Sequence, residues 1–281
     1  MTRDGIDTIV TMALAEDAPW GDITSEAFIP ADATATANLV ARVPGVFSGG
    51  DIFTATFDAV GVASRVLTTD GTLFEAGVIL ATVEGNARAI LRGERVALNL
   101  VQRMSGIATA TSHYVALVAG TRARIVDTRK TVPGLRVLDR HAVTSGGGYN
   151  HRFCLSDAVL AKDNHLAVLT ATGLSVTEAI TQVRATIGHT THLEVEVDRI
   201  DQIVPVLAGG VDTIMLDNFT LDELRAGVAL VDGRALVEAS GNVNLSTVAD
   251  IAATGVDIIS VGALTHSVHA LDIGLDIDLS R

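Results

Sequence analysis

The chain has 281 residues, of which 48% are hydrophobic, and a formal net charge of −13 at pH 7. This length suits one α/β barrel of ordinary size, or a reduced barrel with a second small domain. The acidic balance argues against nucleic acid and anionic membranes as partners, because both bind basic surfaces. No apolar run reaches the ~18 residues of a membrane span, and the first residues lack a secretory signal pattern, so we expect a cytoplasmic protein.

The amino-terminal third combines helical and strand-like segments. Apolar residues recur at helical spacing from Ile6 to Leu14, and Asp17-Ala18-Pro19-Trp20-Gly21 then breaks the helix. Strands are predicted at residues 35–41, 65–68 and 78–83, a helix at 51–59, and a long helical region from 87 to 118. The pattern predicts an α/β sandwich domain over residues 1–105, and we expect the carboxyl-terminal tail, residues 268–281, to pack with it.

From residue 106 to 267, short apolar strands alternate with amphipathic helices. The predicted strands are residues 124–127, 158–162, 192–197, 213–216, 235–239 and 257–261. The predicted helices are at about residues 135–144, 176–186, 200–207, 221–231 and 245–253. This alternation is typical of parallel strands that are joined by crossover helices and covered on both faces.

Polar residues stand at the carboxyl ends of these strands. They are Thr128-Arg129-Lys130, Lys162-Asp163-Asn164-His165, Glu194 with Glu196, Asp217-Asn218, Ser240-Gly241-Asn242 and Gly262-Ala263. An α/β barrel brings such strand ends to one mouth, whereas an open doubly wound sheet spreads them along an edge. The even distribution favours a barrel with its active site at that mouth.

Lysine is scarce, because Lys130 and Lys162 are the only two lysines among 20 cationic side chains. Both lie in the polar motifs after strands. An ammonium differs from a guanidinium as a phosphate ligand or proton donor. We therefore favour a functional role for both over a simple compositional bias toward arginine.

Arg129, His151 and Arg152 are expected at the same mouth, which makes it strongly cationic. A mixture of arginine and lysine suits a ligand that carries both carboxylate and phosphate groups. The alternative is a set of structural ion pairs with Asp127, Asp139 and Asp157. The single cysteine, Cys154, can form no disulfide within the chain, and we expect it to be a small core residue.

Glu194, Glu196 and Asp198 alternate along one predicted strand, so their side chains share a face. Three carboxylates on one face repel each other unless cations, hydroxyls or a metal-bound ligand face them. Solvent exposure is the alternative, and it is favoured for Asp198 at the strand end. With Asp217 on the next strand, Glu196 is a candidate to hold ribose hydroxyls and water-coordinated Mg²⁺.

Two short loops, Ser240-Gly241-Asn242 and Gly262-Ala263, follow the last two strands and precede predicted helices. Backbone N–H groups at a helix amino end bind phosphate, and small residues let the phosphate approach. Each loop alone is weak evidence, and the two together favour a phosphate site. Gly146-Gly147-Gly148 lacks the strand-to-helix context of a dinucleotide-binding loop, so we expect it to present His151 and Arg152 to the pocket.

Together these segments resemble the nicotinate-nucleotide pyrophosphorylase (carboxylating) family, also called quinolinate phosphoribosyltransferase. The resemblance covers nearly the whole chain. Its motifs are Gly21-Asp22-Ile23-Thr24, Gly93-Glu94-Arg95, Ser105-Gly106-Ile107-Ala108-Thr109, Asp127-Thr128-Arg129-Lys130-Thr131, Gly146-Gly147-Gly148 with Asn150-His151-Arg152, Lys162-Asp163-Asn164-His165, Glu194-Val195-Glu196, Met215-Leu216-Asp217-Asn218, Glu238-Ala239-Ser240-Gly241 and Ser260-Val261-Gly262-Ala263.

The resemblance implies an amino-terminal α/β sandwich, an incomplete α/β barrel, and a homodimer whose active sites are completed across the interface. It also implies a glycosyltransferase of NAD biosynthesis. The reaction would join quinolinate to the phosphoribosyl group of phosphoribosyl pyrophosphate with Mg²⁺. The products would be nicotinate mononucleotide, pyrophosphate and CO₂.

Site roles follow from the same resemblance. Arg95 of the partner subunit would hold the quinolinate carboxylates together with Arg129, His151 and Arg152, and Thr128 belongs to the same substrate-binding motif. Lys130 and Lys162 would meet the phosphates or pyrophosphate. Glu196 and Asp217 would serve the ribose and the metal. The loops at Ser240-Gly241-Asn242 and Gly262-Ala263 would bind the 5-phosphate.

Two alternatives remain open at this point. A related barrel protein associated with molybdenum transport shares the Thr128-Arg129-Lys130 segment, but Lys162-Asp163-Asn164-His165 and Met215-Leu216-Asp217-Asn218 argue against it. A non-catalytic sensor of phosphoribosyl metabolites would keep the phosphate loops and could lose Arg95, Lys130 or Glu196. All three residues are present.

Overall fold

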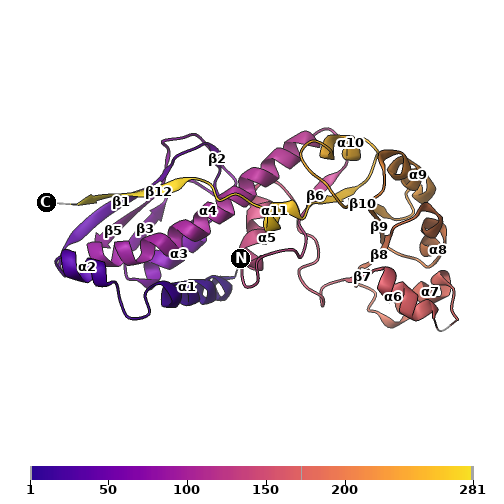
Figure 1. Ribbon diagram of the computed structural model, residues 1–281, viewed down its shortest axis with the longest axis horizontal. Helices are drawn as coiled ribbons and strands as arrows, with labels where there is room; N and C mark the ends of the chain where they lie inside the picture. The colour runs from indigo at the N-terminus through magenta and orange to yellow at the C-terminus, as the bar shows by residue number, and fades with distance from the viewer. Residues whose placement is uncertain (1, 172, 280–281) are drawn as a thin grey trace. The chain divides into compact units, whose positions relative to one another are not determined.

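The computed structural model describes residues 2–171 and 173–279, which form two compact units. The first unit contains the chain up to residue 112, residues 131–147, and the chain from residue 264 onward. The second contains residues 113–130 and 148–263. Figure 1 shows an antiparallel sheet with helices in the first unit and alternating strands and helices in the second.

A four-stranded antiparallel sheet, in the order β12-β1-β5-β3, forms the centre of the first unit. Its strands are β1 (Thr34–Ala41), β3 (Ala63–Val66), β5 (Ile79–Asn86) and β12 (Ile273–Leu279). The other elements are α1 (Arg3–Asp17), α2 (Ile23–Phe28), α3 (Gly50–Ala59) and a ribbon of β2 (Gly45–Val46) with β4 (Leu73–Phe74). The fully buried side chains of its core include Phe47, Phe53 and Phe57. The combination of helices and an antiparallel sheet is the mixed α/β character predicted from the sequence.

The carboxyl-terminal strand β12 pairs with β1 along its whole length, from Ala35 opposite Leu279 to Ala41 opposite Ile273. The chain end is therefore part of the amino-terminal sheet. The sequence prediction did not include β12, β2, β4 or α2 as elements. The predicted strands at 35–41, 65–68 and 78–83 correspond to β1, β3 and β5, with ends that differ by a few residues.

One continuous helix, α4 (Ala87–Leu117), confirms the long helical region predicted from 87 to 118 and runs on through residue 105, where the domain boundary was predicted. Helix α5 (Arg136–Ser145) also lies in the first unit, although its position in the sequence suggested the barrel domain. The reason is a set of contacts with other segments of the first unit. The Arg103 guanidinium on α4 donates twice to the fully buried Asp139 carboxylate, at 2.8 Å each, and His141 meets Asp70 at 2.7 Å.

The second unit is built on six parallel strands in the order β6-β11-β10-β9-β8-β7. They are β6 (Arg124–Val126), β7 (Val159–Ala161), β8 (Leu193–Val197), β9 (Thr213–Asp217), β10 (Leu236–Ser240) and β11 (Ile258–Ser260). Strands β6 and β7 stand at the two ends of this order, so the barrel is incomplete. The predicted positions of the six strands are confirmed, with boundaries that differ by at most two residues.

Helices lie between these strands along the chain. They are α6 (Asp163–Thr170), α7 (Val176–Thr186), the 3₁₀ turn η1 (Ile200–Gln202) leading into α8 (Ile203–Ala208), α9 (Leu221–Val231), α10 (Val248–Ala252) and the short α11 (Ala263–His266). Successive helices from α6 to α10 contact each other outside the strands (Figure 1). Helix α6 was not predicted. Within the described residues, no helix is both long and apolar enough to cross a membrane.

Candidate active site

A cavity of about 480 Å³ opens at the carboxyl ends of the barrel strands. Its size is in the range of small-molecule sites. Eleven of the residues selected from the sequence line it: Thr128, Arg129, Lys130, His151, Arg152, Lys162, Glu196, Asp217, Ser240, Gly241 and Asn242. Five further lining residues, Leu160, Met215, Asn218, Glu238 and Ser260, were given no role in the sequence analysis.

Three of the predicted site residues are not among the residues that line this cavity. Arg95 is an exposed residue of α4 in the first compact unit. Gly262 and Ala263 follow β11 and begin α11, beside the lining residue Ser260 in the sequence. Four apolar residues that follow Arg95 in the sequence are buried in the core of their own chain: Val96, Leu98, Leu100 and Val101.

Four basic side chains, those of Arg129, Lys130, Arg152 and Lys162, line the cavity. Burial lowers the pKa of Arg152 from its ordinary value, and the positive charge of Arg129 lowers it further. The two guanidiniums are therefore close enough to repel each other. Like charges that converge in a cavity favour an anionic ligand, because the ligand relieves their repulsion.

The chain from 149 to 152 is held against β6, the edge strand of the barrel. Val126 and Tyr149 form a parallel bridge, and the Tyr149 N–H donates to the Ile125 carbonyl at 2.8 Å. The fully buried Asp127 carboxylate accepts the His151 N–H at 2.7 Å. These contacts fix the backbone at His151 and Arg152, the two residues that the glycine-rich segment was expected to present.

Carboxylates stand on the neighbouring strands β8 and β9. The Lys162 ammonium lies 2.5 Å from the Glu196 carboxylate, and the Asn218 amide donates to the Asp217 carboxylate at 2.8 Å. Asp198 is exposed and pairs with Arg199, as expected for the strand end. Cys154 is partly exposed, so the prediction of a core cysteine is wrong.

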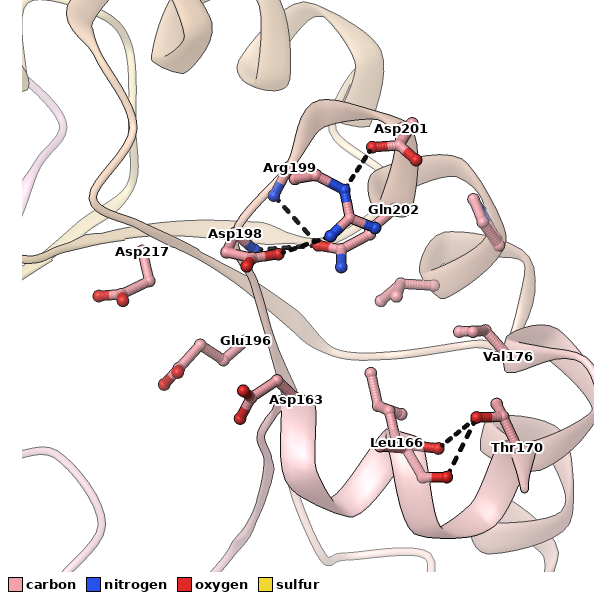
Figure 2. A pocket seen from close by; sticks show the side chains of 13 residues that line it. Asp163, Leu166, Thr170, Val176, Glu196, Asp198, Arg199, Asp201, Gln202 and Asp217 are labelled. Carbon is pink, nitrogen blue, oxygen red and sulfur yellow. Dashed lines mark hydrogen bonds and ion pairs between the residues drawn. The ribbon is translucent and has the colours of Figure 1, made fainter. Parts of the chain in front are cut away.

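A second hollow of about 450 Å³ adjoins the first and shares Glu196 and Asp217 with it. Figure 2 shows the carboxylates of Asp163, Glu196 and Asp217 pointing toward the same side of this hollow. Arg199 lies beyond them and is paired with Asp198 and Asp201. Carboxylate groups from α6, β8 and β9 therefore face the same part of the barrel mouth.

The loops after β9 and β10 depend on left-handed backbone conformations. Asn218, Gly241 and Asn242 have φ angles of 59°, 94° and 51°. The Asn242 amide donates to the Asn218 side-chain oxygen at 3.2 Å, which joins the loops after β9 and β10. Helix α10 begins only at Val248, so the Ser240-Gly241-Asn242 loop does not lead directly into a helix as the sequence suggested.

Comparison with known families identifies both parts of the chain. Residues 22–105 match the quinolinate phosphoribosyl transferase N-terminal domain, and residues 107–276 match the C-terminal domain of the same family. The chain belongs to the quinolinate phosphoribosyl transferase family. The pocket residues Arg129, Arg152 and Glu196 all lie within the matched C-terminal domain.

Relatives within this family match over nearly their whole length. A nicotinate-nucleotide pyrophosphorylase [carboxylating] from Mycobacterium leprae is 46% identical, over 98% of both chains. A probable enzyme of the same name from Bacillus subtilis is 42% identical, over 95% of this chain and 91% of that protein. The crystal structure of NadC from Streptococcus pyogenes superposes with a TM-score of 0.94 at 37% identity, covering 100% and 99% of the two chains. The molybdenum-transport and sensor alternatives are not favoured by these relatives.

The loop after β10 has no room for a side chain at Gly241. A Cβ added there would lie 2.2 Å from the Asn218 side-chain oxygen and 3.0 Å from its backbone nitrogen. Gly241→Ala should displace Asn218, and with it the hydrogen bond that orients Asp217, so kcat/KM should fall at least about tenfold. Steady-state kinetics on the purified variant measures this.

Gly233→Ala is the matched control for this substitution. Gly233 also has a positive φ, of 69°, but a Cβ there would meet nothing within 4 Å. Gly233→Ala should therefore introduce backbone strain alone, which lowers the free energy of unfolding slightly and leaves kcat/KM close to wild type. Equal activity of the two alanine variants would show that the Asn218 contact has no part in the site.

Proposed function

We propose that the protein joins quinolinate to the phosphoribosyl group of phosphoribosyl pyrophosphate, with release of pyrophosphate and CO₂, in NAD biosynthesis. The names of the relatives support this, including a tobacco quinolinate phosphoribosyltransferase [decarboxylating] that is 41% identical over 96% of this chain. The observation that carries the proposal is one cavity lined by both basic side chains and carboxylates. The enzyme would be a pentosyltransferase.

The charges of the cavity match the charges that change during this reaction. As the bond to pyrophosphate breaks, positive charge develops on the ribosyl carbon and negative charge on the leaving group. Glu196 and Asp217 would stabilise the ribosyl cation, while Lys130 and Lys162 would stabilise the pyrophosphate. The Lys162–Glu196 contact of 2.5 Å puts a cation and an anion side by side in this cavity.

Decarboxylation needs no further cofactor in this scheme. The pyridine nitrogen attacks the ribosyl carbon, so the ring becomes cationic. When the adjacent carboxylate leaves as CO₂, the electron pair of the broken bond stays on the ring carbon, where the positive nitrogen stabilises it until a proton is taken up. Arg129 and Arg152 would hold the carboxylates during these steps. His151 differs from them, because both of its ring nitrogens have partners within the protein.

Mg²⁺ fits the carboxylate side of the mouth. Hard oxygen ligands suit this ion, and it usually keeps several waters when it binds with phosphates. Glu196 and Asp217 would hold it through water and substrate, with Asp163 nearby in the second hollow. The ion would neutralise charge on the pyrophosphate.

We also propose a homodimer in which Arg95 of the partner subunit reaches the quinolinate carboxylates. The side chains of Trp20, Ile23 and Phe28 around α2 are 94%, 80% and 81% exposed. Such large apolar side chains gathered on one short segment are typical of a surface that another chain covers. Arg95 lies on α4 in the same compact unit. The cytoplasmic location stays a prediction.

Purified protein with quinolinate, phosphoribosyl pyrophosphate and Mg²⁺ tests the proposed reaction. We expect CO₂ and nicotinate mononucleotide in equal amounts, and no turnover after the metal is chelated. Nicotinate lacks the second carboxylate and would leave a cationic partner unpaired, so its kcat/KM should be at least about 100-fold lower. Comparable turnover of nicotinate, or none of quinolinate, would contradict the proposal.

A further inference from the structure

A buried cluster of His151, Glu194 and Glu238 lies beside the cationic part of the pocket. The His151 Nε2 atom is 3.1 Å from the Glu194 carboxylate and 3.5 Å from the Glu238 carboxylate. The side chains of Glu194 and Glu238 are only 5% and 2% exposed. The second oxygen of each carboxylate has no hydrogen-bond partner among the described residues. Two carboxylates enclosed in this way cannot both be charged without a large cost, unless protons or a cation compensate them.

The two carboxylates face the same ring nitrogen of His151, so a hydrogen atom on Nε2 is directed at both of them. Burial raises the pKa of Glu194, and the charge of Glu238 reinforces this shift. The His151 ring is therefore held on this side by two buried groups.

The backbone indicates the tautomer of the His151 ring. The Arg152 N–H donates to His151 Nδ1 at 2.7 Å, so this nitrogen presents its lone pair. The ring hydrogen is then on Nε2, directed at Glu194. A divalent metal ion bound at Nε2 would require the proton on Nδ1, where it would oppose the Arg152 N–H. An imidazolium would oppose it in the same way.

We propose that Glu194 and Glu238 are positioning residues that act through His151 on Arg152. The carboxylates fix the His151 ring, and its Nδ1 fixes the Arg152 backbone N–H. The Arg152 guanidinium donates to the Ala158 carbonyl at 3.0 Å, so both ends of this residue are held. Arg152 is thereby kept beside Arg129 in the lining of the cavity. The inference rests on the proposed function, because it assigns Arg152 to the pyridine substrate.

The first test is a rescue experiment at His151. His151→Phe keeps a ring but removes the Nδ1 acceptor, so KM for quinolinate should rise and kcat/KM for quinolinate should fall by about 100-fold, as expected when a substrate-holding group is misplaced. KM for phosphoribosyl pyrophosphate should stay within about threefold. His151→Asn has a side-chain oxygen near the Nδ1 position and no ionisable group, and it should recover most of the lost kcat/KM. If His151 instead touched quinolinate as a cation, His151→Asn would be as impaired as His151→Phe, and this result would overturn the proposal.

The second test observes the His151 ring directly in the wild-type protein. In wild-type protein labelled with ¹⁵N-histidine, the His151 signals, assigned by their loss in His151→Asn, should show Nε2 protonated and Nδ1 unprotonated between pH 6 and 8. Two protonated ring nitrogens, or a stoichiometric zinc ion lost in Glu238→Gln, would reject the proposal. Wild-type protein that does not turn over quinolinate would instead contradict the proposed function. The ¹⁵N spectrum would still report on the cluster.

Discussion

Lys130→Arg should lower kcat/KM for quinolinate and phosphoribosyl pyrophosphate by at least about 100-fold, although the positive charge is retained. Lys130 lines the cavity beside Arg129, and its backbone N–H is tied to the Thr128 hydroxyl at 3.1 Å. Two guanidinium groups, those of Arg129 and Arg152, already line this cavity of about 480 Å³. The guanidinium of a third arginine is larger than an ammonium and hydrated differently. We expect it to displace the phosphate groups from their proposed contacts with Mg²⁺ and Lys162. Steady-state kinetics with each substrate varied in turn measures the loss.

Two matched variants separate local geometry from charge. Lys162→Arg changes a side chain that is 49% exposed, so the larger head group has room and a smaller loss is expected. Arg225→Lys, on the exposed surface of α9 beside Asp222, exchanges the same two residue types far from the cavity and should leave kcat/KM unchanged. A Lys130→Arg enzyme within about threefold of wild type would mean that only the charge of Lys130 matters.

The barrel could be predicted from the sequence because its strands are short apolar runs followed by polar residues. Covered parallel strands produce that pattern directly, since both faces pack against other layers. Strand β12 was missed despite a signal. Ile273, Leu275 and Ile277 alternate with glycine or aspartate, which is the period-two pattern of a strand with one buried face. Helix α6 has no such signal, because its apolar residues occupy several sides and Val168 is 73% exposed.

The mouth of the barrel was predictable for the same reason, but the buried partners of its residues were not. Glu238 lies within the apolar run of β10 and was given no role. A carboxylate inside a covered strand needs a compensating partner, and this could have marked it. Its partner could not be identified, because His151 comes from a segment that joins β6 through a single bridge. Contacts between segments with no shared periodicity leave no trace in one sequence.

The proposed homodimer, in which the partner completes the active site, can be tested through Arg95. Its neighbours Val96, Leu98 and Val101 are core residues of their own chain, so their apolar character gives no evidence for an interface. Arg95 itself is exposed. Arg95→Ala and Lys130→Ala should each lower kcat/KM by at least about 100-fold as homodimers, because each removes a cation that we propose to face the anionic substrates.

Mixing the two variants distinguishes a shared site from a site within one chain. In a two-fold mixed dimer, a shared arrangement places both lesions in one site and leaves the other site intact, so the doubly tagged heterodimer should recover about half of wild-type activity. Unselected co-expression should give about a quarter, since about half of the dimers are mixed. If Arg95 serves its own subunit, every site retains one lesion. A doubly tagged heterodimer as inactive as its parents, with both parents folded and dimeric by light scattering, would therefore place Arg95 outside the partner's site.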